Sequence, residues 1–291
     1  MAARLAHYYF EQRGLPSKKK ILSRVDGYHG STYFAANLTG IHGTKIGFNR
    51  IAEDMIHHLS VANMYRAPDG MDEEAYCDFL VMELENRIEQ LGADNIAAFF
   101  AEPVMGAGGV LVAPEGYHRR VQQVCKANDI LFIADEVVTG FGRLGEWFVS
   151  ETLYQCQPDM IVSAKGISSG YIPLGATIIS DEIHAEIARP QVEGGSLSMG
   201  FTYSGHAVAC AAALKNIEIM ERENICQHVR DTGPALLREL QVLTDLPIVG
   251  DVRGSHYMVG IELVSNKQNK TGFDATVGSS QRVFKRCLNR G

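Results

Sequence analysis

Two charged residues stand at the ends of two short apolar segments, and their types suit one kind of chemistry. Lys165 follows the run Met160-Ile161-Val162-Ser163-Ala164, and Asp135 follows the run Ile130-Leu131-Phe132-Ile133-Ala134. Both runs are too short and too rich in β-branched residues for helices, so we expect buried strands. Open α/β sheets bind ligands outside the carboxyl ends of their strands. A lysine that forms a Schiff base and an aspartate that pairs with a pyridinium nitrogen are the groups that pyridoxal phosphate chemistry requires.

Each of these residues also has an ordinary structural explanation. A lysine at a strand end is usually solvated, and the pair Asp135-Glu136 can simply cap the loop after a buried strand. In favour of chemistry, Gly166 and Gly170 turn the backbone sharply just after Lys165. A lysine that is partly desolvated beside a cationic ring has a lowered pKa and becomes a usable nucleophile.

Aromatic and apolar residues near these strands are candidates for contact with a planar ring. Tyr28 and His29 follow an expected strand, where an aromatic side chain can stack on a cofactor. The alternative is a loop tyrosine beside a surface histidine. Val137 comes two residues after Asp135, on the same side of an extended chain, and can pack under a ring.

Two further segments suit polar contacts with a ligand. Glu102 ends an expected strand and precedes a turn with three glycines, although plain turn geometry explains such glycines equally well. Thr202 and Ser204 come just before an expected helix, whose free N–H groups suit a phosphate. The alternative for Ser204 is that it caps this helix, and we expect His206 to be a surface residue of the first turn.

Composition excludes several classes of protein. The chain has 291 residues, of which 46% are hydrophobic and 21% charged, as in ordinary globular domains. The net charge of −7 argues against a general nucleic-acid binder, and no apolar stretch approaches the length of a membrane span. The six cysteines form no C-x-x-C pair, so we expect free thiols, no metal site and a cytoplasmic location.

The order of expected elements positions these residues in an α/β fold. Helices are predicted over residues 1–13, 46–65, 73–91, 114–128, 206–222 and 276–289. Strands are predicted over residues 21–25, 96–101, 130–134, 160–164, 175–179, 248–252 and 257–264. In the helix over 206–222, we expect the inward side chains to be Ala209, Ala212, Ala213 and Leu214. Strands that alternate with helices predict a mostly parallel central sheet with helices on both faces.

Taken together, residues 20–264 resemble the class III pyridoxal-phosphate-dependent aminotransferases, and within them the ω-amino acid or amine:pyruvate transaminases. The segments that carry the resemblance are Tyr28-His29-Gly30, Ala101-Glu102-Pro103-Val104, Asp135-Glu136-Val137, Thr139-Gly140-Phe141-Gly142-Arg143, Ala164-Lys165-Gly166, Gly170-Tyr171-Ile172-Pro173-Leu174-Gly175 and Thr202-Tyr203-Ser204-Gly205-His206. The resemblance implies the aspartate-aminotransferase-like fold, which is type I of the pyridoxal-phosphate folds. It also implies a homodimer with a shared active site.

The resemblance implies a role for each matching residue. The residues that it assigns to the cofactor site are Tyr28, His29, Glu102, Asp135, Val137, Lys165 and Thr202. Lys165 would hold the cofactor and move the proton, and Asp135 would pair with the ring nitrogen. Tyr28 and Val137 would cover the two faces of the ring. Glu102 would lie near the ring hydroxyl or the substrate, and Thr202 would reach the phosphate of the partner subunit.

The resemblance also bears on domains and on competing functions. Residues 1–222 are expected to form a large cofactor-binding domain, and residues 223–291 the beginning of a smaller C-terminal α+β domain. Relatives of this kind carry further segments at both ends, so we expect an internal portion of a transaminase. The activity expected is transfer of an amino group between an amine or ω-amino acid and a keto acid such as pyruvate. The alternatives are an aminomutase or epimerase on the same fold, or a truncated, catalytically silent chain.

Overall fold

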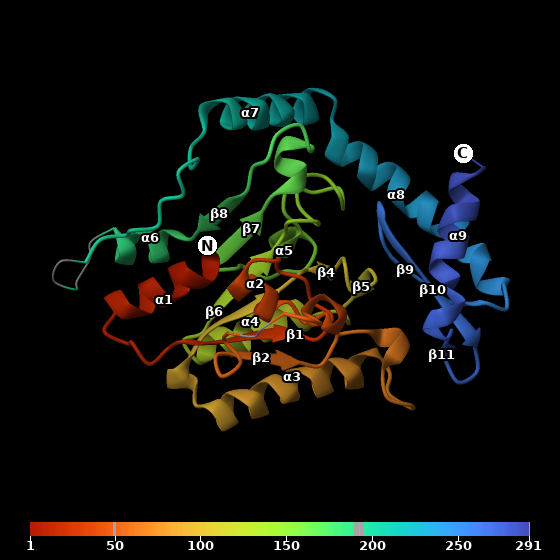
Figure 1. Ribbon diagram of the computed structural model, residues 1–291, viewed down its shortest axis with the longest axis horizontal. Helices are drawn as coiled ribbons and strands as arrows, with labels where there is room; N and C mark the ends of the chain where they lie inside the picture. The colour runs from red at the N-terminus through yellow and green to blue at the C-terminus, as the bar shows by residue number, and fades with distance from the viewer. Residues whose placement is uncertain (49–50, 189–191, 193–194, 291) are drawn as a thin grey trace.

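A largely parallel sheet forms the centre of the molecule (Figure 1). The computed structural model describes residues 1–48, 51–188, 192 and 195–290. Within them, the sheet has the order β2-β1-β3-β6-β7-β8. Its strands are β1 (Lys20–Arg24), β2 (Ile56–Leu59), β3 (Ile96–Ala101), β6 (Leu131–Asp135), β7 (Met160–Ser163) and β8 (Ala176–Ile179). All neighbouring strands run parallel except β7 and β8, which confirms the predicted mostly parallel sheet.

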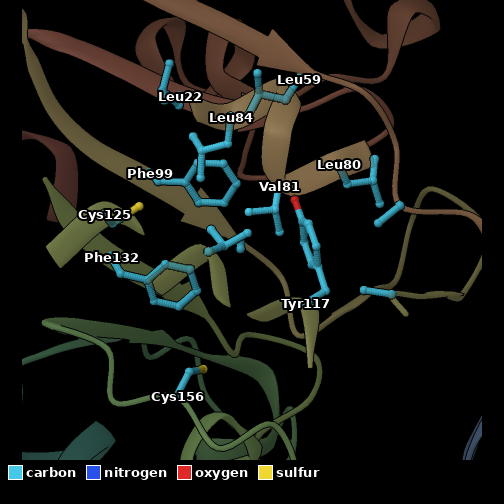
Figure 2. Close-up of a cluster of buried hydrophobic side chains, with 14 of the residues drawn as sticks. Leu22, Leu59, Leu80, Val81, Leu84, Phe99, Tyr117, Cys125, Phe132 and Cys156 are labelled. Carbon is cyan, nitrogen blue, oxygen red and sulfur yellow. The ribbon is translucent and has the colours of Figure 1, made fainter. Parts of the chain in front are cut away.

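Helices cover both faces of this sheet because side chains alternate along its strands. Helices α3 (Glu73–Leu91) and α4 (Tyr117–Ala127) pack on one face, where Phe99 and Phe132 stack with ring centroids 6.0 Å apart. Figure 2 shows this buried cluster. Helices α1 (Ala2–Gln12) and α6 (Asp181–Ile187) pack on the other face, against Ala98 and Phe100. The strands are therefore apolar on both sides, as is typical of parallel sheets.

A second sheet lies beside the first, toward the C-terminus (Figure 1). It has the order β11-β10-β9 and is antiparallel. Its strands are β9 (Val249–Ser255), β10 (Met258–Asn266) and β11 (Thr271–Gly272), and helices α8 (Ile225–Gln241) and α9 (Ser279–Leu288) lie beside it. Helix α7 (Ala207–Arg222) lies apart from this sheet, against residues 165–168. The remaining elements are α2 (Tyr33–Leu38), α5 (Val149–Thr152), the hairpin β4 (Val104–Met105) with β5 (Leu111–Val112), and the 3₁₀ turns η1 (His42–Lys45), η2 (Met64–Arg66), η3 (Ala93–Asn95), η4 (Lys165–Ser168), η5 (Val242–Asp245) and η6 (Ala275–Val277).

The helix predicted over residues 46–65 is wrong. Residues 49–50 lie outside the described residues, but Ile56–Leu59 is strand β2, which pairs parallel with β1. Pairing with a strand from a distant part of the chain overrides local helix propensity here. Helix α7 has the predicted bounds, yet Leu214 is 68% exposed while Ala209, Ala213 and Met220 are buried. The buried Ala209 and Ala213 therefore confirm the expected inward face of α7, and the assignment of Leu214 to that face is wrong.

Two expectations from composition can be compared with the structure. All six cysteines lie in the described part of the chain and are free, with Cys77, Cys125 and Cys156 buried. Burial raises the pKa of the Cys156 thiol to about 12, so this group is an inert member of the core. Among the described helices, none has both the length and the apolar character that crossing a membrane requires.

A buried histidine in α4 should make the stability of the fold sensitive to acid. The Nε2–H of His118 donates to the Pro103 carbonyl over 3.0 Å, and burial, followed by the charge of Arg24, lowers the pKa of His118 to about 3. In the unfolded chain a histidine titrates near about 6.5. Between these values the unfolded state binds more protons, so stability falls as the pH drops. We expect this one group to cost about 2 kcal/mol between pH 7 and pH 5.

Urea unfolding of His118→Gln at both pH values checks this expectation, since glutamine keeps a donor for Pro103. The variant should gain about 2 kcal/mol relative to the native protein on going from pH 7 to pH 5. His42→Gln, at an exposed position, is the control and should show no such gain. An equal pH dependence for the native protein and His118→Gln would contradict the assignment.

Candidate active site

Three charged residues lie at or just beyond the carboxyl ends of three adjacent strands of the main sheet. Ala101 pairs with Ala134 in β3 and β6, so Glu102 and Asp135 are neighbours in register. Asp135 pairs with Val162 of β7, and Lys165 comes just beyond the end of that strand. The parallel order of the strands therefore brings these residues to the carboxyl edge, where open sheets bind ligands.

Asp135 is a buried carboxylate with two donors. It is 8% exposed, and its Oδ2 accepts from Nδ1 of His29 over 2.8 Å. Its Oδ1 accepts from the backbone N–H of Val137 over 3.2 Å. Because a carboxylate only accepts, Nδ1 of His29 must carry the proton. The carboxylate is thus held in one orientation before any ligand arrives.

His29 is not the surface histidine that we weighed as an alternative. Its side chain is 3% exposed and packs edge-on against Phe100, with ring centroids 5.8 Å apart. The pairing of His29 with Asp135 joins residues from the ends of β1 and β6. Nothing in the local sequence around His29 indicated this partner.

A cavity of about 560 Å³ opens beside Asp135. Its wall is mainly apolar and includes Phe34, Leu38, Phe100 and Val137. Beyond Asp135 and His29, the polar part of the wall includes Ser163, whose hydroxyl is buried and has no hydrogen-bond partner among the described residues. An apolar cavity with one anchored carboxylate suits an aromatic ring that carries a protonated nitrogen.

The neighbouring Glu136 has a purely structural task. It is fully buried, and its carboxylate accepts from the N–H groups of Val149 and Ser150, over 2.9 and 2.9 Å. It also accepts from the hydroxyls of Ser150 and Thr139, over 2.6 and 3.1 Å. The capping role that we considered for the Asp-Glu pair therefore belongs to Glu136, while Asp135 faces the cavity.

Lys165 occupies a strained backbone position next to the cavity. Its φ is +44°, a value that residues other than glycine rarely adopt. A Cβ on the following Gly166 would lie 2.7 Å from Cβ of Phe141, so the loop around Phe141 presses on this turn. The adjacent Ala164 lines the cavity, but Lys165 itself is exposed. The described residues of this chain do not provide the partial desolvation that we expected for Lys165.

Glu102 supports the loop that carries Tyr28. The carboxylate is 5% exposed, and it accepts from the N–H groups of Tyr28 and Gly106 over 2.8 and 2.9 Å. Burial raises the pKa of Glu102, and the nearby His29 opposes this shift. The Tyr28 hydroxyl lies 2.9 Å from Oγ of Ser31, and Tyr28 does not line the cavity.

Thr202 does not join this group of residues. It is exposed, and it lies in the segment that leads from α6 to α7, along the edge of the molecule (Figure 1). The alternative that Ser204 caps α7 does not hold, because the ring Nδ1 of His206 accepts from the N–H of Ala209 over 3.3 Å. Ser204 instead accepts from the N–H of Phe201 within the preceding turn.

Comparison with known proteins decides the family. A family model described as aminotransferase class-III matches residues 1–291. This chain belongs to the class III aminotransferases. The class III chain is 41% identical over 290 residues to gamma aminobutyrate transaminase 2 of Solanum lycopersicum, covering 99% of this chain and 63% of that protein. It is 40% identical over 292 residues to the putrescine–pyruvate aminotransferase of Pseudomonas aeruginosa, covering 99% and 62%.

A solved structure of the ω-transaminase from Pseudomonas jessenii in complex with PMP has the same fold. Its TM-score is 0.90 at 42% identity, with 94% of this chain and 60% of that one covered. This class III aminotransferase chain thus spans less than two thirds of the length of these relatives. Class III aminotransferases use pyridoxal phosphate. The donor set of the cavity fits that group, because it combines an anchored carboxylate, an apolar wall and an unpartnered buried hydroxyl. The described residues contain no cluster of side chains that could hold a metal ion.

Proposed function

We propose that the protein transfers an amino group between an amine or ω-amino acid and a keto acid such as pyruvate, with pyridoxal 5'-phosphate as cofactor. The observation that carries the proposal is the buried Asp135 carboxylate, oriented by His29 and Val137 at the wall of the cavity, one strand from Lys165. An aspartate held in this way suits a ring nitrogen that must stay protonated.

The cofactor, when bound, supplies an electron sink for the carbanion that forms at the amine carbon. Asp135 would keep the ring nitrogen cationic, and His29 would keep the carboxylate correctly oriented. Val137 would support one ring face, and we expect Tyr28, which stands outside the cavity wall in this chain, to cover the other face once the cofactor is bound. The Lys165 amine would hold the cofactor and then carry the proton from the substrate carbon. Glu102 would act on Tyr28 through its backbone N–H.

The names of the relatives support the substrate class. They include a gamma aminobutyrate transaminase and a putrescine–pyruvate aminotransferase, whose donors carry an amino group at the end of an unbranched chain. The test is to supply the protein with cofactor, pyruvate and, in turn, putrescine, gamma-aminobutyrate or an aromatic amine. Alanine formed in proportion to donor consumed supports the proposal. Isomerised amine without alanine would instead indicate an aminomutase or epimerase, and no turnover with any donor would indicate a silent chain.

We also propose a homodimer whose partner subunit completes the site. The support is the exposure of large apolar side chains around Thr202, where Phe201 is 62% and Tyr203 80% exposed. Tyr171, just beyond the Lys165 turn, is 89% exposed. Exposed apolar patches of this kind mark interaction surfaces. The same exposure leaves Thr202 free to reach the phosphate in a second copy.

Mixing two inactive variants tests the shared site. A Lys165→Ala chain and a Thr202→Ala chain should each be weak alone, because each lacks one residue of every site. After subunit exchange, one site in each heterodimer regains both residues, so roughly a quarter of the native activity should return. Native mass spectrometry would verify the exchange. Verified heterodimers without recovered activity would count against Thr202 acting across an interface.

Two further expectations remain proposals. The division into residues 1–222 and 223–291 is supported by the separate sheet of β9, β10 and β11. A cytoplasmic location is supported by the six free thiols, since reducing compartments keep cysteines in this form.

A further inference from the structure

One glycine-rich turn touches both the cavity side of the molecule and the C-terminal sheet. Residues 106–110 connect β4 to β5, and the N–H groups of Gly109 and Val110 both donate to the Gly106 carbonyl over 3.1 Å. Val110 has a φ of +52°, which is a true outlier for a β-branched residue. Such strain persists only where the surroundings hold the backbone in place. The contacts on both sides of this turn must therefore stabilise its strained backbone.

On the cavity side, the turn is joined to the loop of Tyr28. The Glu102 carboxylate accepts from Gly106 with one oxygen and from the Tyr28 N–H with the other, over 2.9 and 2.8 Å. The turn also packs directly on the residues before Tyr28, because a Cβ on Gly108 would lie 2.4 Å from the Asp26 carbonyl oxygen. A shift of the turn would therefore move the Tyr28 loop.

On the other side, Gly260 of β10 packs closely on the turn, and the Arg253 guanidinium joins the turn to the C-terminal sheet by hydrogen bonds. Arg253 of β9 donates through Nη2 to the Gly109 carbonyl over 2.7 Å, and through Nε to the carbonyls of Gly109 and Val110, each over 3.1 Å. Its Nη1 donates to Glu262 over 2.6 Å and to Asp251 over 3.0 Å. The side chain is only 15% exposed. Hydrogen bonds from a charged donor that is largely buried are stronger than hydrogen bonds between neutral groups.

We propose that Arg253 is a positioning residue for the loop of Tyr28 and His29, of which His29 lines the cofactor cavity, and that it acts through the turn 106–110 and Glu102. The C-terminal sheet then determines how rigidly the loop of Tyr28 is held beside the cavity. The link is indirect and runs through the turn and Glu102. The physical link requires no cofactor. The effect of this link on cofactor binding rests on the function proposed above for Tyr28.

The chain offers a matched control for Arg253. Arg66 of η2 also binds Glu262, through Nε and Oε1 over 2.9 Å, and it donates to the Lys270 carbonyl in the same C-terminal region. Arg253 uses the other oxygen of the same carboxylate. Both arginines thus fasten the C-terminal sheet, but only Arg253 donates to the turn.

Hydrogen exchange in the protein without added cofactor tests the link. In Arg253→Met, exchange of the Tyr28 amide should speed up by at least about tenfold, because its acceptor Glu102 loses a fixed turn. Amides of β3, in the centre of the sheet, should not change. In Arg66→Met, the Tyr28 amide should stay protected. An unchanged Tyr28 amide in Arg253→Met, or equal opening in both variants, would overturn the proposal. If Arg253→Met fails to fold, Arg253→Lys, which keeps the charge but not the forked geometry, carries the same test.

Cofactor titration separates the link from the role of Tyr28. Arg253→Met should weaken binding of pyridoxal phosphate by about tenfold in the native background, and by much less when Tyr28 is already leucine. Additive losses would mean that Arg253 acts on binding by another route. Faster Tyr28 exchange together with no cofactor binding by any variant would leave the link intact and refute the function proposed above.

Discussion

Replacing Lys165 with alanine should abolish covalent capture of the cofactor and slow transamination by about 10²–10⁴-fold. The residue is expected to serve both as nucleophile and as proton carrier, and a positioned acid–base group alone contributes a factor of this size. The measurement is alanine formation from pyruvate, together with borohydride reduction of the protein after incubation with pyridoxal phosphate. The reduced label should be found on the peptide that contains Lys165.

The matched control is Lys126→Ala, at an exposed position on α4. It should keep both the label and the rate of the native protein. A label on Lys45, on Lys126 or on any other lysine would show that the assignment of Lys165 is wrong.

Asp135→Asn should damage catalysis far more than folding. A neutral amide cannot keep the ring nitrogen protonated, and loss of a buried charge partner commonly costs about 3–5 kcal/mol. Applied to the transition state, this corresponds to a rate loss of about 10²–10³ or more. The fold should tolerate the change, because asparagine can still accept from Val137, and His29 can adopt the other neutral tautomer opposite the new amide.

Parallel measurements of turnover and of the urea midpoint distinguish the two effects. Asp69→Asn, at an exposed position, is the control and should change neither quantity. An Asp135→Asn protein with near-native turnover would refute the role, and a protein that no longer folds would show that Asp135 is chiefly structural.

Much of the large sheet could be predicted because short local sequence patterns specify its strands. The segments at 96–101, 130–134 and 160–164 are apolar on both faces and end at a charged residue or a glycine turn, and they fold as β3, β6 and β7. Helix α3 was equally clear, with Asp72 as its cap, whose side chain accepts from the Ala75 N–H over 2.9 Å. Such signals lie within a few residues of one another.

Errors arose where distant partners decide the outcome. Ile56–Leu59 is a strand because β1 lies beside it, and nothing within residues 46–65 specifies that neighbour. The exposure of Leu214 has the same origin, since a helix alone does not determine which of its faces finds a partner.

The family, the segments that form β3, β6 and β7 and the charged residues at their carboxyl ends could all be predicted from the sequence. The tertiary structure supplied the physical reason why Asp135 and not Glu136 faces the cavity, since Glu136 accepts hydrogen bonds from the N–H groups of residues 149 and 150. It also decided that His29 orients Asp135 and that Arg253 reaches the turn near Glu102. These partners are separated by 106 and 144 positions in the chain. Hydrogen bonds across such distances depend on strand register and on the docking of the second sheet, which local patterns do not encode.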